Sequence, residues 1–143
     1  MKEKKGKIIL TKEKNITNRN GYDNQPAFFN NNCMLFISHI NDQNDIMIYD
    51  MYEDKLTNLT KTKTSECSPY PILGYTSFAT VRVEEDSTQR LWMSQMDDKT
   101  DPRMVFEKIA PVGYFIWNSD NHTLMFVLGQ ICNCYNRQCK LSE

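Results

Sequence analysis

The sequence predicts an all-β fold: a partial β-propeller of about two complete four-stranded antiparallel blades plus pieces of two neighbouring blades. Three observations support this fold class. Several features recur about 43 residues apart, short apolar runs of strand length alternate with polar turns, and no long window keeps the 3.6-residue period of an amphipathic helix. Four short antiparallel strands in roughly 40–45 residues are typical of one propeller blade.

The repeat is clearest in one tripeptide and one proline. Asn-Ile-Thr at 15–17 returns 43 residues later as Asn-Leu-Thr at 58–60. Pro26 returns as Pro69 after the same interval, and again as Pro111 after a further 42 residues. Each proline precedes an apolar run, and proline is tolerated at the first residue of a strand. We therefore expect these prolines to open the innermost strand of each blade.

Within each repeat the strands follow in hairpin order. In the first repeat, the apolar runs 33–38 and 45–51 flank the polar turn 41–44. The second repeat has the same order of runs and turns. Runs 34–37 and 124–128 are apolar on both faces, as expected for strands that neighbouring blades cover on both sides.

The partial propeller is expected to span residues 6–129, and residues 130–143 are interpreted as an unrelated or disordered tail. The predicted units are the end of a preceding blade at 6–17, a blade at 26–60, a blade at 69–107 and the start of a further blade at 111–128. Known propellers have 4 to 8 blades, and four repeats of this length exceed the 143 residues present. We therefore expect a fragment of a longer propeller, with self-association or a second polypeptide as other ways to complete the ring.

Three segments carry the motifs of a known repeat. Residues 45–51, Asp-Ile-Met-Ile-Tyr-Asp-Met, match an Asp-Ile-Tyr-x-Tyr-Asp-Leu outer strand, and 56–60 match a closing Leu-Thr segment. Residues 65–69, Ser-Glu-Cys-Ser-Pro, match a Ser-Glu-x-Ser-Pro segment that opens the next blade. With these motifs the chain resembles the TolB-like propeller family. The family's usual Ser-Pro-Asp-Gly turn is replaced at 29–32 and 72–75, where Asn and Gly still take positive φ readily.

The resemblance implies a non-catalytic scaffold that binds a protein or peptide. It also implies a periplasmic or exported location, although the sequence has no signal peptide, so the localisation is left unknown. Two alternatives stay open. The chain is the substrate-gating propeller portion of a serine peptidase whose catalytic domain is missing, or it is a truncated remnant without function.

The amino-acid composition argues against two classes of partner, nucleic acids and membranes. The formal net charge is −1 and the pI about 6.1, so the chain as a whole has no long-range attraction for nucleic acid. No apolar run approaches the roughly 18 residues that a membrane helix needs, so membrane insertion is not expected. The lysines near the start are interpreted as a solvated edge strand.

The search for catalytic chemistry leads to no candidate residues. There is no Gly-x-Ser-x-Gly segment, and the histidines, His39 and His122, lack the partners of a catalytic triad. Cysteines 132, 134 and 139 with His122 make a zinc site conceivable, but Cys-x-Cys is tight for one ion and the cluster is interpreted as accidental. No cofactor and no metal are therefore expected. The tentative binding residues are Asp23 and Glu66, equivalent carboxylates placed near one mouth of the channel.

Overall fold

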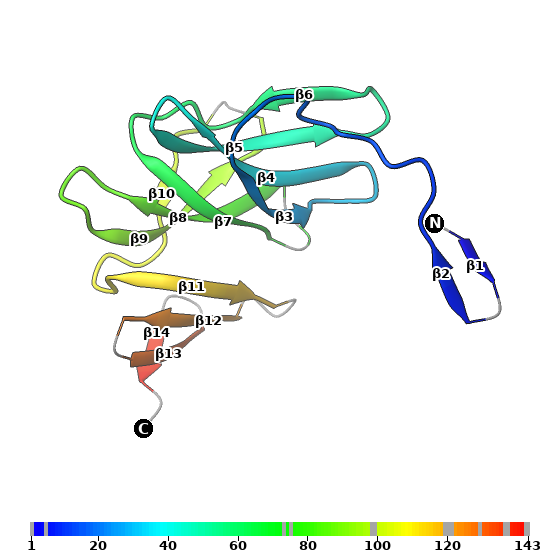
Figure 1. Ribbon diagram of the computed structural model, residues 1–143. Helices are drawn as coiled ribbons and strands as arrows, with labels where there is room; N and C mark the ends of the chain where they lie inside the picture. Colours follow the sequence, from blue (N-terminus) through cyan, green and yellow to red (C-terminus); the bar gives the residue numbers. More distant parts are fainter. Residues whose placement is uncertain are drawn as a thin grey trace.

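The computed structural model describes residues 2–4, 6–72, 74, 76–97, 100–118, 122–128, 130–135 and 138–141, with side chains from residue 6 to residue 128 of these ranges. The fold is all-β, with three four-stranded antiparallel sheets and one two-stranded hairpin (Figure 1). Among the residues described, no helix is long and apolar enough to cross a membrane.

The first sheet comprises β3 (Asp23–Phe28), β4 (Cys33–Ile40), β5 (Gln43–Asp50) and β6 (Lys55–Asn58), in that spatial order. Each strand pairs with the next along the chain, as in a propeller blade. The turn between β4 and β5 has positive φ at both Asn41 and Asp42. This conformation matches the twist of the flanking strands, and Asn and Asp tolerate it better than most residues.

The second sheet repeats this order with β7 (Ser65–Pro71), β8 (Ser77–Val83), β9 (Gln89–Gln95) and β10 (Arg103–Met104). Its inner strand lies beside β3 on one side and β11 on the other. Consecutive four-stranded sheets that share this arrangement confirm the predicted fold class, a partial propeller.

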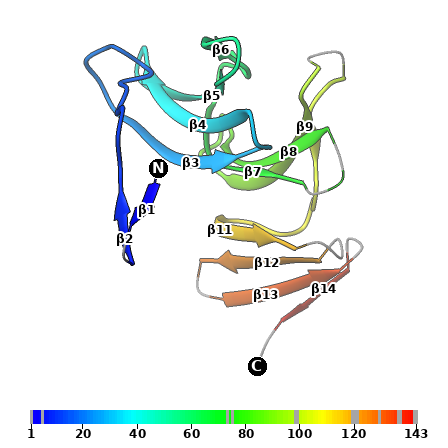
Figure 2. The ribbon, with the colours of Figure 1, turned by 90° about the vertical axis from the view of Figure 1, so that its right-hand side faces the viewer.

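The third sheet corrects the interpretation of residues 130–143 as an unrelated or disordered tail. It contains β11 (Val112–Trp117), β12 (His122–Val127), β13 (Gln130–Tyr135) and β14 (Gln138–Leu141) (Figure 2). β13 pairs with β12 along its whole length, and β14 pairs with β13. β13 provides partners for the backbone N–H and C=O groups along the outer edge of β12, a non-local pairing that the motif search along the sequence does not detect.

The N-terminal region also differs from the prediction. Residues 6–17 were expected to end a preceding blade, but β2 (Lys7–Ile9) pairs with β1 (Lys2–Lys4) in a separate two-stranded sheet. The chain then runs without strand structure to residue 22. Ile16 packs on the first sheet, beside Tyr49.

The prolines do not open the inner strands. β3 begins three residues before Pro26, β7 begins four residues before Pro69, and β11 begins just after Pro111. Pro26 and Pro69 instead lie inside shifts of register between the inner strand and its neighbour. Proline has no N–H to donate to a ladder, and an edge-strand bulge is a position that tolerates this loss.

The hydrophobic core lies between the sheets. Leu35 and Ile46 of the first sheet pack with Phe78 of the second. Val81 and Leu91 of the second pack in one cluster with Met125 of the third. Each of these side chains is almost completely buried, so the sheets stack face to face.

Candidate functional site

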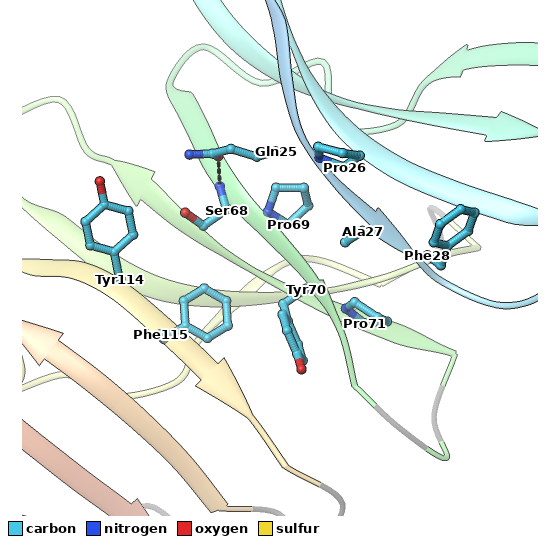
Figure 3. Close-up of a pocket in the computed structure, with 10 residues that line it drawn as sticks. All are labelled: Gln25, Pro26, Ala27, Phe28, Ser68, Pro69, Tyr70, Pro71, Tyr114 and Phe115. Carbon is cyan, nitrogen blue, oxygen red and sulfur yellow. Dashed lines mark hydrogen bonds between the residues drawn. The ribbon is translucent and has the colours of Figure 1, made fainter. Parts of the chain in front are cut away.

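A groove of about 560 Å³ lies where the inner strands of the three sheets meet (Figure 3). Its walls come from β3, β7 and β11, the first strand of each sheet. The lining residues are Gln25, Pro26, Ala27, Phe28, Ser68, Pro69, Tyr70, Pro71, Tyr114 and Phe115. Inner strands surround the axis of a complete propeller, so the groove lies on the side of the sheets that faces such an axis.

Two equivalent bulges shape the groove. Gln25 and Ser68 both have left-handed backbone conformations, with φ of 55° and 54°, and each is followed by a proline. The register of the inner strand shifts at both places. A bulge re-aims the side chains around it, which turns Gln25 and the prolines toward the groove instead of along a regular ladder.

The three inner strands are joined by one polar and one aromatic contact. Gln25 Oε1 accepts a hydrogen bond of 2.5 Å from the backbone N–H of Ser68, which ties β3 to β7. The rings of Tyr70 and Phe115 lie edge to face, with centroids 6.1 Å apart, which ties β7 to β11. The groove is therefore held by contacts between blades and not by a single flexible loop.

The lining has no charged side chain among its ten residues. Aromatic rings and prolines dominate it, and the rings of Phe28 and Tyr114 are about two-thirds exposed. Binding of a ligand to this surface removes apolar area from water, which stabilises the complex. A charged ligand would find no side chain of opposite charge in the lining. The lining suits an uncharged, extended, partly apolar chain.

Asp23, the first predicted binding residue, lies at the start of β3. Its Oδ1 accepts hydrogen bonds from Ser38 Oγ at 2.6 Å and from Arg19 Nη2 at 2.7 Å. Partial burial alone would raise the pKa of Asp23, but the hydrogen bonds from Ser38 and Arg19 hold it below its ordinary value.

Glu66, the second, is fully buried in β7. It accepts hydrogen bonds from the hydroxyls of Thr60 and Thr62, and Arg82 Nε lies 3.4 Å from its carboxylate. The Arg82 guanidinium also stacks over the ring of Trp92 at 4.5 Å. Burial raises the pKa of Glu66 above its ordinary value, and the threonines and Arg82 only partly oppose this.

The structure thus places Asp23 and Glu66 at equivalent positions, each engaged with protein groups around the start of an inner strand. Neither is among the residues that line the groove. Ligand binding by these two carboxylates stays a prediction. The groove itself was missed by sequence reasoning, although its signal was present: the recurring Pro26 and Pro69 mark its two bulges.

Neither of the histidines considered for catalysis, His39 and His122, is among the lining residues of the groove. His39 Nδ1 lies 3.0 Å from Asn44 Oδ1, beside the turn that joins β4 and β5. Within the described part of the chain, no three His, Cys, Asp or Glu side chains gather closely enough to hold a metal ion. The backbone register sets Cys134 opposite Cys139, but the side chains of the predicted cysteine cluster lie outside the described ones.

No protein-family model matches the sequence, and neither does any curated protein. The structure does match the crystal structure of TolB from Acinetobacter baumannii, with a TM-score of 0.68 and 12% sequence identity. The chain has the fold of a TolB-like propeller. This match covers 85% of the chain but 32% of TolB, so the chain spans about a third of the length of that protein. At this identity the similarity to TolB concerns the fold alone.

Proposed function

We propose that this TolB-like chain is a non-catalytic module that binds an extended segment of a protein or peptide in the inner-strand groove. The single observation that carries the proposal is the uncharged lining of rings and prolines shared by three blades. Concave apolar sites with few polar groups are typical binding sites.

The inner strands favour one manner of binding. Pro26 in β3 and Pro69 and Pro71 in β7 lack the N–H groups that strand addition would need. A ligand strand added beside β3 or β7 could therefore form only an incomplete set of backbone hydrogen bonds. Aromatic and proline surfaces instead suit a polyproline II segment, which docks through side chains and loses little conformational entropy on binding.

We also infer that the chain is part of a larger propeller. Three four-stranded sheets are fewer than the 4 to 8 blades of known propellers. The match to about a third of TolB supports a fragment whose other blades come from a longer protein. In such a ring the groove becomes one side of the channel, and a ligand would contact further blades as well.

Binding is tested with the 143-residue chain and a fluorescein-labelled peptide containing Pro-x-x-Pro and no charged residue, followed by fluorescence anisotropy. Phe28→Ser removes an exposed ring from the groove and is expected to weaken binding about tenfold, in keeping with roughly 1–2 kcal/mol for an exposed aromatic contact. The matched control is Tyr52→Ser, an exposed aromatic in the turn after β5. Equal affinities for Phe28→Ser and wild type would contradict the groove as the binding site.

A further inference from the structure

The side-chain amide of Gln25, in the wall of the groove, uses only its oxygen within the protein. Oε1 accepts the hydrogen bond from the backbone N–H of Ser68 at 2.5 Å, and only the amide oxygen can accept. Nε2 lies on the other side of the planar amide, and Figure 3 shows it directed away from Ser68. No group of the described residues accepts from Nε2, and this nitrogen is not among their buried polar atoms without a partner. Its N–H donors are therefore open to solvent.

The main chain at the two bulges leaves few other donors. Pro26 and Pro69 have no N–H. The N–H of Gln25 donates to Asn24 Oδ1 at 2.7 Å, and the N–H of Ser68 is used by Gln25 itself. Apart from the hydroxyl of Ser68, the Gln25 amide is therefore the remaining hydrogen-bond donor of these two residue pairs, each made of a bulge residue and its proline.

The Gln25 amide is also held in one orientation before any ligand arrives. A side chain that becomes ordered only on binding costs conformational entropy, which lowers the affinity. The hydrogen bond to Ser68 fixes the plane of the Gln25 amide, and the left-handed backbone of the bulge, with φ of 55°, aims the side chain at the second blade. The direction of the Nε2 donors is thus set by a contact between two blades.

From this arrangement we infer that Gln25 Nε2 donates a hydrogen bond to a main-chain carbonyl of the bound segment and so fixes where that segment lies along the groove; the inference rests on the proposed function of the groove. The free atoms of the amide are donors only, because Oε1 is taken. A polyproline II segment presents solvated carbonyls and, at each proline, no N–H. The ligand class is therefore a proline-rich segment, whose acceptors match this donor and whose rings match the apolar lining.

The variant Gln25→Glu removes the donor but keeps an acceptor for the Ser68 N–H. Its affinity for the same uncharged Pro-x-x-Pro peptide, measured by anisotropy, is expected to fall about tenfold. The matched control is Asn24→Asp, which adds the same charge one residue away, keeps the Oδ1 acceptor and lies outside the groove lining. This control should bind like wild type. Equal losses in the two variants would assign the effect to charge and overturn the inference.

Nuclear magnetic resonance of the wild-type chain tests the same bond without a substitution. Addition of the peptide should shift the side-chain NH₂ signals of Gln25 and leave those of Gln43 in place, because Gln43 Nε2 already donates to Asp45 and to the carbonyl of Thr62. Unmoved Gln25 signals at saturation, or equal affinities of Gln25→Glu and wild type, would overturn this inference alone, provided that Phe28→Ser still weakens binding. Absence of peptide binding by wild type would contradict the proposed function and, with it, this inference.

Discussion

Gln25 accepts a hydrogen bond from the backbone of Ser68, and the two residues occupy the same place in successive blades, 43 positions apart. Both have left-handed φ values and both precede a proline. The bulge of one blade is therefore fastened to the bulge of the next, directly beside the groove. This contact links the sequence repeat to the position of the proposed binding surface.

Loss of the Gln25 side chain is expected to weaken the junction of the first two blades. Gln25→Ala leaves the Ser68 N–H without its acceptor and should lower the free energy of unfolding by about 1 kcal/mol. Chemical denaturation measures this difference. Gln25→Glu keeps two acceptor oxygens and serves as the control; equal losses in both variants would show that the hydrogen bond is not the cause.

The left-handed backbone conformation of Ser68 leads to a second prediction, about substitutions at this position. At φ 54° a β-branched side chain crowds the backbone, so Ser68→Val should lower the free energy of unfolding by about 1–2 kcal/mol. Ser68→Gly retains the N–H group and accepts this φ without strain, so its loss should be smaller. Thermal melts of the two variants give the comparison, and a more stable Val variant would argue against the bulge.

The ring contact between the second and third blades is expected to show energetic coupling. Tyr70→Leu and Phe115→Leu each remove one ring of the edge-to-face pair. A double-mutant cycle should give a coupling of about 0.5–1.5 kcal/mol. Additive losses would mean that the two inner strands do not meet through these rings.

Asp23 and Glu66 should affect stability with opposite dependence on pH. The pKa of Asp23 is lowered on folding, so its contribution is present above the ordinary value of 3.8 and is lost as pH falls through the folded pKa. The pKa of Glu66 is raised, so its contribution is present below the ordinary value of 4.5 and is lost as pH rises through the folded pKa.

These signs are measured by urea unfolding across pH 3 to 8 against Asp23→Asn and Glu66→Gln. The advantage of wild type over Asp23→Asn should shrink on acidification. The stability of wild type relative to Glu66→Gln should instead fall as pH rises above 4.5. Parallel pH profiles for the two pairs would contradict the different environments of the two carboxylates.

The repeat was enough to predict stacked sheets, because Pro26 and Pro69 occupy equivalent places in successive units. It was not enough to place the prolines, since a bulge inside a strand and the start of a strand tolerate the same missing N–H. Residues 130–135 form a strand that pairs with β12, and such a non-local pairing cannot be predicted from the local sequence. The recurring prolines mark the two bulges beside the groove, but the groove itself forms only where three strands meet, which the local sequence does not show.

The stacking of separate sheets around β3, β7 and β11 is tested most directly by nuclear Overhauser contacts in the 143-residue chain. We predict cross-peaks between the Gln25 side chain and the Ser68 amide, and between the rings of Tyr70 and Phe115. Cross-strand Hα–Hα contacts should stay within each sheet. A continuous ladder of such contacts from β6 to β7, as in a single closed barrel, would contradict the propeller arrangement.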